Sequence, residues 1–226
     1  MIDKRLSCVA SFVRVGAVLA DIGTDHAYLP VQLVQEGKVP RAIAADIGEG
    51  PAASARQHIR EAGLSDRIEV RVCDGLHGVA AGEVSDVVIA GMGGETIVHI
   101  VSEAPWLKQK DIRLVLQPMT KSTELRRWLF ANGFAILEER IVLDGRHIYC
   151  TMAAEYDGGE APTDPLAPYV GALTPTADNR PYFEQQRTYL TQRIRGLRCG
   201  EKNDEAEALS AILAQLETFM NGGEDQ

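Results

Sequence analysis

The chain has 226 residues, of which 45% are hydrophobic and 24% are charged, and its formal net charge is −9 at pH 7. This length is enough for one α/β domain with a full core and a smaller appendage. The sequence has no apolar run of the roughly 18 residues that a membrane span needs, and its first segment predicts no secretory signal.

Apolar and amphipathic segments alternate along the first two thirds of the chain. Apolar side chains at helical spacing predict an opening helix over residues 3–14. Five buried strands are predicted at 17–23, 41–47, 67–75, 85–94 and 112–119. Helices are predicted at 28–37, 50–63, 95–107 and 121–133, the last with Ser122 or Thr123 as its N-cap. Residues 134–156 alternate around an Asp-Gly turn, which predicts a β-hairpin.

This order of segments predicts an α/β fold with a doubly wound, mostly parallel sheet and an antiparallel hairpin at one edge. Right-handed crossovers place the loops that follow the strands at the carboxyl edge of the sheet, where such folds bind ligands. After Asp157 a segment rich in Gly, Pro and Thr predicts a linker. Two amphipathic helices, at about 181–198 and 203–220, then predict a helical hairpin. We therefore expect two domains, residues 1–157 and 158–226.

The loop after the first strand, D-I-G-T-D-H at residues 21–26, combines one glycine with two carboxylates. A dinucleotide fingerprint would need glycine at Asp25 and Tyr28, and pyrophosphate would be repelled by Asp21 and Asp25. S-adenosylmethionine fits better, because it carries an ammonium and a sulfonium group and no phosphate. Acidic side chains attract the ammonium group, and Gly23 lets the backbone approach the ligand closely.

Two further carboxylates follow the next two strands. Asp46 is placed to accept hydrogen bonds from a ribose diol. Asp74 is placed to accept one from an adenine amino group, with Leu76 packing near the ring. Either aspartate alone is equally compatible with a helix N-cap. Carboxylates at three successive strand ends favour a cofactor site.

The fourth strand ends in A-G-M-G-G-E, residues 90–95. Gly93 and Gly94 allow a tight turn and close approach of a substrate or of a transferred methyl group; a packing turn at a helix start is the competing interpretation. The segment lacks the Asn/Asp-Pro-Pro-aromatic motif typical of enzymes that methylate exocyclic amines. A ring nitrogen, whose lone pair is already available, is therefore the expected acceptor.

The net negative charge taken alone argues against a nucleic-acid partner. Between residues 180 and 202, however, the chain has six basic residues and only two acidic ones. Arginines at 187, 193, 195 and 198 would supply phosphate contacts, and a solvated helix face is the alternative. The four cysteines lie far apart and without metal-ligand spacing, so we expect reduced thiols and no metal.

The segments A-D-I-G-T-D-H-A-Y-L-P (20–30), A-G-M-G-G (90–94) and L-V-L-Q-P-M (114–119) resemble the bacterial tRNA (adenine-N1)-methyltransferase family, TrmK. The resemblance runs from about Lys4 to Tyr156. It implies a Rossmann-like methyltransferase domain followed by a helical, coiled-coil-like domain, with S-adenosylmethionine as cofactor and adenine 22 of tRNA as acceptor. By position, it implies a cofactor site made of Asp21, Gly23, Asp25, His26, Asp46, Asp74, Gly75, Gly91, Met92, Gly93 and Gly94. The family often ends its fifth strand in Gln-Pro-Asn, whereas this chain has Met119 in place of the asparagine.

Direct attack by N1 needs no strong base, so the catalytic requirement is a carboxylate that stabilises the charge arising on the adenine. Asp25 is the first candidate for this catalytic role and Glu95 the second. The expected substrate contacts are Tyr28, Gln117, Pro118, Arg187, Arg193, Arg195 and Arg198. Two other functions stay open: a small-molecule methyltransferase, and a non-catalytic RNA-binding protein with the same fold. We expect a cytoplasmic protein with no membrane contact; its oligomeric state is open, with a monomer as the working expectation.

Overall fold

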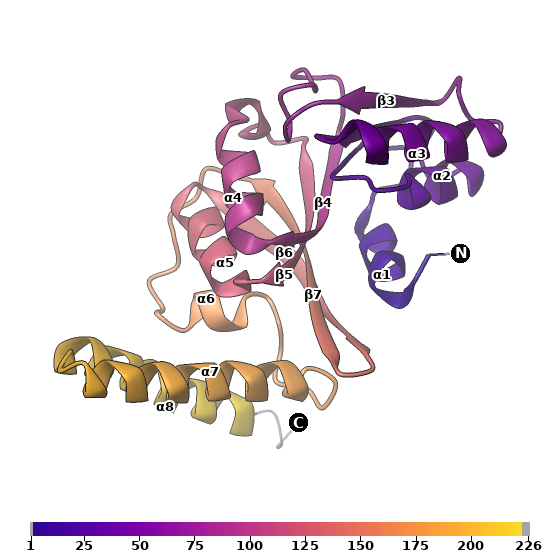
Figure 1. Cartoon of the computed structure of the whole chain (residues 1–226). Helices are drawn as coiled ribbons and strands as arrows, with labels where there is room; N and C mark the ends of the chain where they lie inside the picture. The colour runs from indigo at the N-terminus through magenta and orange to yellow at the C-terminus, as the bar shows by residue number, and fades with distance from the viewer. Residues whose placement is uncertain (1, 223–226) are drawn as a thin grey trace. The chain divides into compact units, whose positions relative to one another are not determined.

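A computed structural model describes residues 2–222 (Figure 1). The chain divides into two compact units, Met1–Ala161 and Pro162–Gln226. Among residues 2–222, no helix combines the length and the apolar character that crossing a membrane requires.

A seven-stranded sheet forms the centre of the first unit, in the order β3-β2-β1-β4-β5-β7-β6. The strands are β1 (Leu19–Ile22), β2 (Ala42–Asp46), β3 (Ile68–Val72), β4 (Asp86–Gly93), β5 (Arg113–Thr120), β6 (Phe134–Asp144) and β7 (His147–Tyr156). The first five are parallel, and β7 runs antiparallel to both β5 and β6. The predicted doubly wound sheet with an antiparallel edge hairpin is therefore confirmed.

Helices cover both faces of this sheet (Figure 1). They are α1 (Lys4–Phe12), α2 (Tyr28–Gln35), α3 (Glu49–Glu61), α4 (Gly94–Ser102), the 3-10 helix η1 (Pro105–Leu107) and α5 (Ser122–Ala131). The first three pack on one face, where Leu19, Ala44 and Val88 of the sheet join their apolar side chains in one core cluster. Strands β1, β2, β4 and β5 are mostly buried and mostly apolar, as expected for strands covered on both faces. The prediction of a buried strand is wrong for β3, which lies at the edge of the sheet, carries Glu69 and Arg71 and is largely exposed or half-buried.

Two details of the helices differ from the predictions. The helix expected at 95–107 ends at Ser102, because proline disfavours helical backbone in the residue before it, and η1 then begins at Pro105. The N-cap of α5 is Lys121, not Ser122 or Thr123. Lys121 has a left-handed backbone with φ of 58°. Its carbonyl packs against Gly94, where a Cβ would lie 2.3 Å from Lys121 O, so close packing fixes this start.

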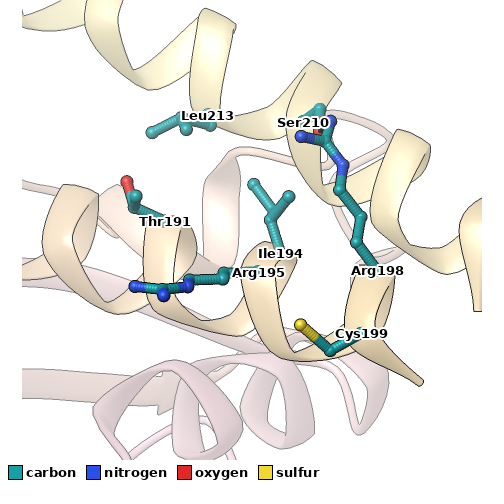
Figure 2. A pocket seen from close by; sticks show the side chains of 7 residues that line it. All are labelled: Thr191, Ile194, Arg195, Arg198, Cys199, Ser210 and Leu213. Atoms are coloured by element: carbon teal, nitrogen blue, oxygen red, sulfur yellow. Dashed lines mark hydrogen bonds between the residues drawn. The ribbon is translucent and has the colours of Figure 1, made fainter. Parts of the chain in front are cut away.

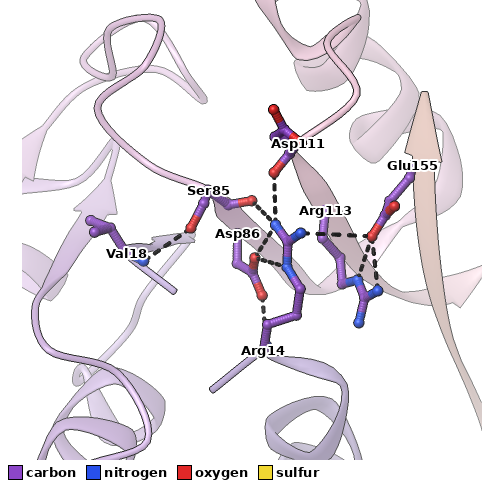
Figure 3. Close-up of polar contacts among 7 residues, drawn as sticks. All are labelled: Arg14, Val18, Ser85, Asp86, Asp111, Arg113 and Glu155. Carbon is purple, nitrogen blue, oxygen red and sulfur yellow. Dashed lines mark hydrogen bonds and ion pairs between the residues drawn. The ribbon is translucent and has the colours of Figure 1, made fainter. Parts of the chain in front are cut away.

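An arginine–aspartate pair holds the amino edge of the sheet (Figure 3). Arg14 donates from Nε to Asp86 Oδ1 at 2.7 Å and from its backbone N–H to Asp86 Oδ2 at 2.8 Å. Its Nη2 also donates to the carbonyl oxygens of Ser85 and Asp111, at 2.7 and 2.8 Å. Because the side chain of Asp86 is fully buried, these bonds compensate a charge that water cannot reach.

The second unit contains α6 (Ala167–Val170), α7 (Arg180–Cys199) and α8 (Asn203–Asn221). The apolar stripes of the two long helices face each other: Phe183, Leu190 and Ile194 of α7 are buried, as are Leu216 and Met220 of α8. The rings of Phe183 and Phe219 meet edge to face, with centroids 5.3 Å apart. The helical hairpin predicted from the sequence is confirmed, with bounds one residue from those expected.

Candidate cofactor and methyl-transfer site

The predicted cofactor residues follow strands that are neighbours in the sheet. Strands β3, β2, β1, β4 and β5 are parallel, so their carboxyl ends lie at one edge. The strand order reverses between β1 and β4, and the crevice at such a reversal is where doubly wound folds bind ligands. The structure therefore brings the loops after these strands together at one edge.

Asp21 is the most perturbed group at this edge. It is 7% exposed. Burial raises the pKa of its carboxyl, a hydrogen bond with Thr24 opposes that increase, and the nearby charge of Asp46 adds to it; together they raise the pKa to about 6. Two carboxylates that influence each other in a partly desolvated site create a negative potential, which a bound cation would relieve.

Asp46 closes the turn after β2. Its Oδ1 accepts a hydrogen bond from the backbone N–H of Gly48 at 2.7 Å, just before α3 begins. The next residue, Ile47, is 67% exposed, which is unusual for a large apolar side chain. Leu76, expected beside an adenine ring, is buried, and that contact stays a prediction; the exposed apolar side chain next to Asp46 is Ile47. Sequence reasoning missed Ile47, whose signal is an apolar residue directly after the strand-end carboxylate.

The loop after β3 carries the third carboxylate. Asp74 is exposed, and Gly75 adopts φ of 51°. A Cβ on Gly75 would lie 3.1 Å from Ile100 of α4, so this glycine lets the loop pack closely on that helix. The hydrogen bond of Asp74 to an adenine stays a prediction.

Gly23 and Met92 meet across the crevice. Gly23 has φ of 77°, and a Cβ there would lie 2.1 Å from Met92 Cε. Met92 follows Gly91, where the β4–β5 register shifts. An extra residue in one strand bends it and redirects its side chains. The structure thus brings Gly23 and Met92, two predicted cofactor residues from separate loops, together on one wall of the crevice.

Gly93, which ends β4, and Gly94, which begins α4, differ in how much space lies beside them. A Cβ on Gly93 would meet Thr120 Oγ1 at 3.4 Å, an ordinary contact, whereas Gly94 lies against the Lys121 backbone. For Gly94, the structure favours the packing interpretation. Glu95 forms an ion pair with Lys121, with Nζ and Oε2 2.5 Å apart.

Asp25 lies at the surface of the first loop, with its side chain 77% exposed and Oδ2 3.4 Å from His26 Nε2. The N-cap of α2 is Ala27, which has left-handed backbone and makes no side-chain hydrogen bond to the cap. The catalytic roles of Asp25 and Glu95 stay predictions. Of the two, Asp25 is the carboxylate without a lysine partner among the described residues.

Three aromatic rings gather beside the first loop. The ring centroid of Tyr28 lies 5.2 Å from that of His26 and 4.9 Å from that of His58. His58 Nδ1 lies 2.7 Å from the carbonyl oxygen of His26 and donates to it, because a carbonyl only accepts. Tyr28 is half exposed, which leaves its ring available to a ligand. Sequence reasoning missed His58, which belongs to α3 and joins the loop only through the tertiary fold.

Gln117 and Pro118 are buried residues near the end of β5. Gln117 Oε1 accepts from Arg5 Nη1 at 2.8 Å and from the Gly91 N–H at 3.1 Å. Met119, which follows them, is 47% exposed. Substrate contact by Gln117 and Pro118 stays a prediction, and the buried position of Gln117 favours a supporting role. Sequence reasoning also missed Arg5.

In the second unit, a cavity of about 470 Å³ lies between α7 and α8 (Figure 2). It is lined by Thr191, Ile194, Arg195, Arg198, Cys199, Ser210 and Leu213. Arg198 Nη2 donates to Ser210 Oγ at 3.3 Å. Arg187, in contrast, is held by Glu184 at 2.5 Å. Among residues 2–222, no carboxylate lies within ion-pair distance of the arginines at 193, 195 and 198.

All four cysteines are free thiols. Cys150 is buried, and burial raises the pKa of its thiol, which keeps it neutral. Within the part of the chain that the structure describes, no three His, Cys, Asp or Glu side chains are grouped so that they could hold a metal ion.

The chain is similar in sequence and in structure to known methyltransferases. A family model described as a methyltransferase domain matches residues 2–152. The tRNA (adenine(22)-N(1))-methyltransferase of Bacillus subtilis is 38% identical over 172 residues, which are 76% of this chain and 72% of the relative. The crystal structure of B. subtilis TrmK covers 97% of this chain and 99% of its own, with a TM-score of 0.85 and 30% identity. Streptococcus pneumoniae Sp1610 in complex with S-adenosyl-L-methionine covers 97% and 100%, with a TM-score of 0.82 and 32% identity.

Proposed function

The chain belongs to the tRNA (adenine-N1)-methyltransferase family, and from this premise we propose that it methylates N1 of adenine 22 in tRNA, with S-adenosylmethionine as the methyl donor. The observation that carries the proposal is the carboxyl edge of the sheet. There, buried Asp21 lies near Asp46, and Gly23 lies against Met92. The B. subtilis relative supplies the acceptor, since its name specifies N1 of adenine 22.

The residues at this edge fit the methyl donor. Asp21, whose pKa is raised to about 6, would hold the ammonium group, because a nearby cation stabilises its ionised form. Asp46 would accept hydrogen bonds from the ribose hydroxyls, and exposed Ile47 would pack on the adenine face. Gly23, with no Cβ, would let the donor lie close to the loop backbone. The S. pneumoniae relative, which shares this fold, binds S-adenosyl-L-methionine.

The chemistry asks little of the protein beyond placement. When bound, S-adenosylmethionine supplies an electrophilic methyl group, so that the N1–CH₃ bond forms as the S–CH₃ bond breaks and the positive charge moves to the adenine. Adenine N1 holds its lone pair in the ring plane, so no base removes a proton first. The protein must hold N1 in line with the methyl group at near-attack distance.

Side chains that follow or end the parallel strands would receive the target base. Tyr28 offers a half-exposed ring, and Met119 a partly exposed thioether, for contact with the adenine faces. Asp25, exposed in the loop after β1, would stabilise the positive charge that develops on the base. Displacing an adenine from a stack costs a few kcal/mol, so these contacts must offset that cost.

The arginines of α7 would bind the tRNA backbone. Arg195 and Arg198 line a cavity together with Ile194 and Leu213, and neither arginine has a carboxylate partner among residues 2–222. Guanidinium groups that are not neutralised by a carboxylate bind phosphate oxygens through several hydrogen bonds. They would provide local positive charge on a chain whose net charge is −9. A tRNA substrate also places the reaction in the cytoplasm.

A nucleoside assay tests the function. The protein is incubated with methyl-labelled S-adenosylmethionine and an unmodified tRNA transcript with adenine at position 22; the matched control has guanine there. We expect labelled 1-methyladenosine from the first transcript and none from the second. Label in neither transcript would contradict the proposal, and label in both would contradict the assigned position. Methylation of a small molecule alone would favour the small-molecule alternative.

A further inference from the structure

Arg5 belongs to α1, outside every loop that the sequence assigns to the site, yet it reaches the carboxyl edge of the sheet. Its Nη1 donates to Gln117 Oε1 at 2.8 Å, across 112 positions of the chain. The side chain is 19% exposed, and its contact with Asp3 is a long one of 3.9 Å. Its guanidinium carbon also lies 5.9 Å from the centre of the Tyr149 ring. The hydrogen bond to Gln117 is therefore its shortest polar contact.

Gln117 is a buried carboxamide with both ends engaged. Its Oε1 also accepts from the backbone N–H of Gly91 at 3.1 Å, and its Nε2 donates to the carbonyl of Pro118 at 3.0 Å. Reversing the amide would place an N–H group against the donors from Arg5 and Gly91, so these contacts fix one orientation. Gln117 thus connects α1 to the ends of β4 and β5.

The bond to Gly91 matters because the sheet is irregular there. Ala90 pairs with Gln117 and Met92 pairs with Pro118, so Gly91 is an extra residue in β4. It adopts φ of 81°, which only glycine takes readily. The extra residue of a bulge lies outside the regular ladder, and here its N–H donates to Gln117 instead. The residue that follows the bulge, Met92, is the one whose methyl group occupies the space beside Gly23.

We propose that Arg5 is a positioning residue for methyl transfer: through Gln117 it holds the bulge at Gly91, and so fixes Met92 against Gly23 beside the methyl donor. This inference rests on the proposed function, since it assigns Arg5 a task in that same reaction. Loss of Arg5 then slows the methyl-transfer step, because the wall beside the donor moves. The proposal predicts little change in the affinities for S-adenosylmethionine and tRNA, because it assigns Arg5 an effect through Gln117 and no contact with either ligand.

The experiment uses the full chain and four variants. Arg5→Met removes the donor, and Arg5→Lys keeps one, which suffices because Arg5 makes a single hydrogen bond to Gln117. Gln117→Leu removes the connection from the other side. Lys4→Met is the matched control, since Lys4 is an exposed cation on the same turn of α1 with no polar contact to Gln117. Circular dichroism and thermal melting establish that each variant is folded.

The first measurement is the single-turnover rate of tRNA methylation with both substrates saturating. A misplacement of about 1 Å at a reacting centre lowers rates by up to about a hundredfold. We expect Arg5→Met and Gln117→Leu to be at least about tenfold slower than the parent protein, with the Kd of S-adenosylmethionine and of tRNA within about twofold. Arg5→Lys should recover most of the rate, and Lys4→Met should match the parent.

The second measurement does not depend on activity. The parent protein is labelled with methyl-¹³C methionine, and the Met92 methyl resonance is assigned with Met92→Leu. We expect that resonance to shift in Arg5→Met and Gln117→Leu and to stay in place in Lys4→Met. If the parent protein methylates no tRNA, the proposed function fails. The Met92 resonance still shows whether Arg5, acting through Gln117 and Gly91, fixes the position of Met92.

Two outcomes would overturn the inference. In the first, Arg5→Met changes neither the methylation rate nor the Met92 resonance, just as the control Lys4→Met changes neither. In the other, Arg5→Met weakens tRNA binding while the saturated rate is unchanged, which would make Arg5 an RNA contact. If Arg5→Met does not fold, Gln117→Leu and Arg5→Lys decide by the same criteria.

Discussion

The two edges of the central sheet treat buried carboxylates in opposite ways. At the amino edge, fully buried Asp86 receives hydrogen bonds from the side chain and the backbone of Arg14. At the carboxyl edge, buried Asp21 has a threonine hydroxyl and a second carboxylate nearby, and its pKa is raised to about 6. Within residues 2–222, neither Asp21 nor Asp46 has an arginine or lysine within ion-pair distance. The first edge compensates its charge inside the protein, and the second leaves a negative site for a cationic ligand.

The largest expected effect is the loss of Arg14. Arg14→Met leaves Asp86 buried without its cation, and breaking a buried pair from one side costs about 3–5 kcal/mol of unfolding free energy. Urea denaturation measures this loss. The matched control is Arg56→Met, which removes an exposed pair with Glu49 and should cost less than about 1 kcal/mol. Equal losses in the two variants would contradict the difference drawn between buried and exposed pairs.

Removing the charge of Asp21 should have the opposite sign. The pKa of Asp21 is raised in the folded protein, so its contribution to stability is fully present below about pH 3.8 and is lost as the pH rises through about 6. Asp21→Asn keeps an acceptor for Thr24 and removes the charge. We expect it to raise the unfolding free energy by about 3 kcal/mol at pH 8 and by less than about 1 kcal/mol at pH 4.

Urea denaturation of the cofactor-free protein at the two pH values checks this. A stabilisation that does not depend on pH, or a destabilisation at pH 8, would show that the ionised carboxylate of Asp21 is compensated by the protein.

A similar contrast occurs in α7: Arg187 is paired with Glu184, whereas Arg198 has a serine and no carboxylate as partner within the described residues 2–222. If unpaired arginines bind phosphate, Arg198→Gln should weaken tRNA binding by about three- to tenfold and lower the slope of log K against log[salt] by about 1. Arg187→Gln should change affinity by less than about twofold. Filter binding at several salt concentrations measures both, and equal effects would remove the distinction.

The sequence predicted what depends on local pattern. The strand from Asp86 to Gly93 and the helices α7 and α8 were predicted to within a residue or two, because apolar period and turn residues directly reflect burial. The short helix α6 was not predicted, because it lies in a segment rich in Gly, Pro and Thr that indicated a linker. Asp21 and Asp46 were assigned to the site because parallel strands must end at one edge, whatever their exact packing.

The rest of the site depends on tertiary detail. The bulge at Gly91 is a register shift between two strands, and no periodicity encodes it. Arg5 and His58 reach the edge from α1 and α3, through contacts that exist only once those helices have packed. The sequence shows that an apolar residue, Ile47, follows Asp46, but it does not show that this side chain is exposed. The exposure is what makes Ile47 a candidate ligand contact.

The most direct test of the central claim is the affinity for S-adenosylmethionine at pH 7 and at pH 5, measured by calorimetry. If the ionised form of Asp21 holds the ammonium group, a pKa of about 6 predicts a Kd about tenfold higher at pH 5. Asp21→Asn should bind weakly at both pH values, with no such change, while His26→Gln should keep the tenfold change. A Kd that is the same at both pH values in the parent protein, or that changes equally in Asp21→Asn, would contradict the account.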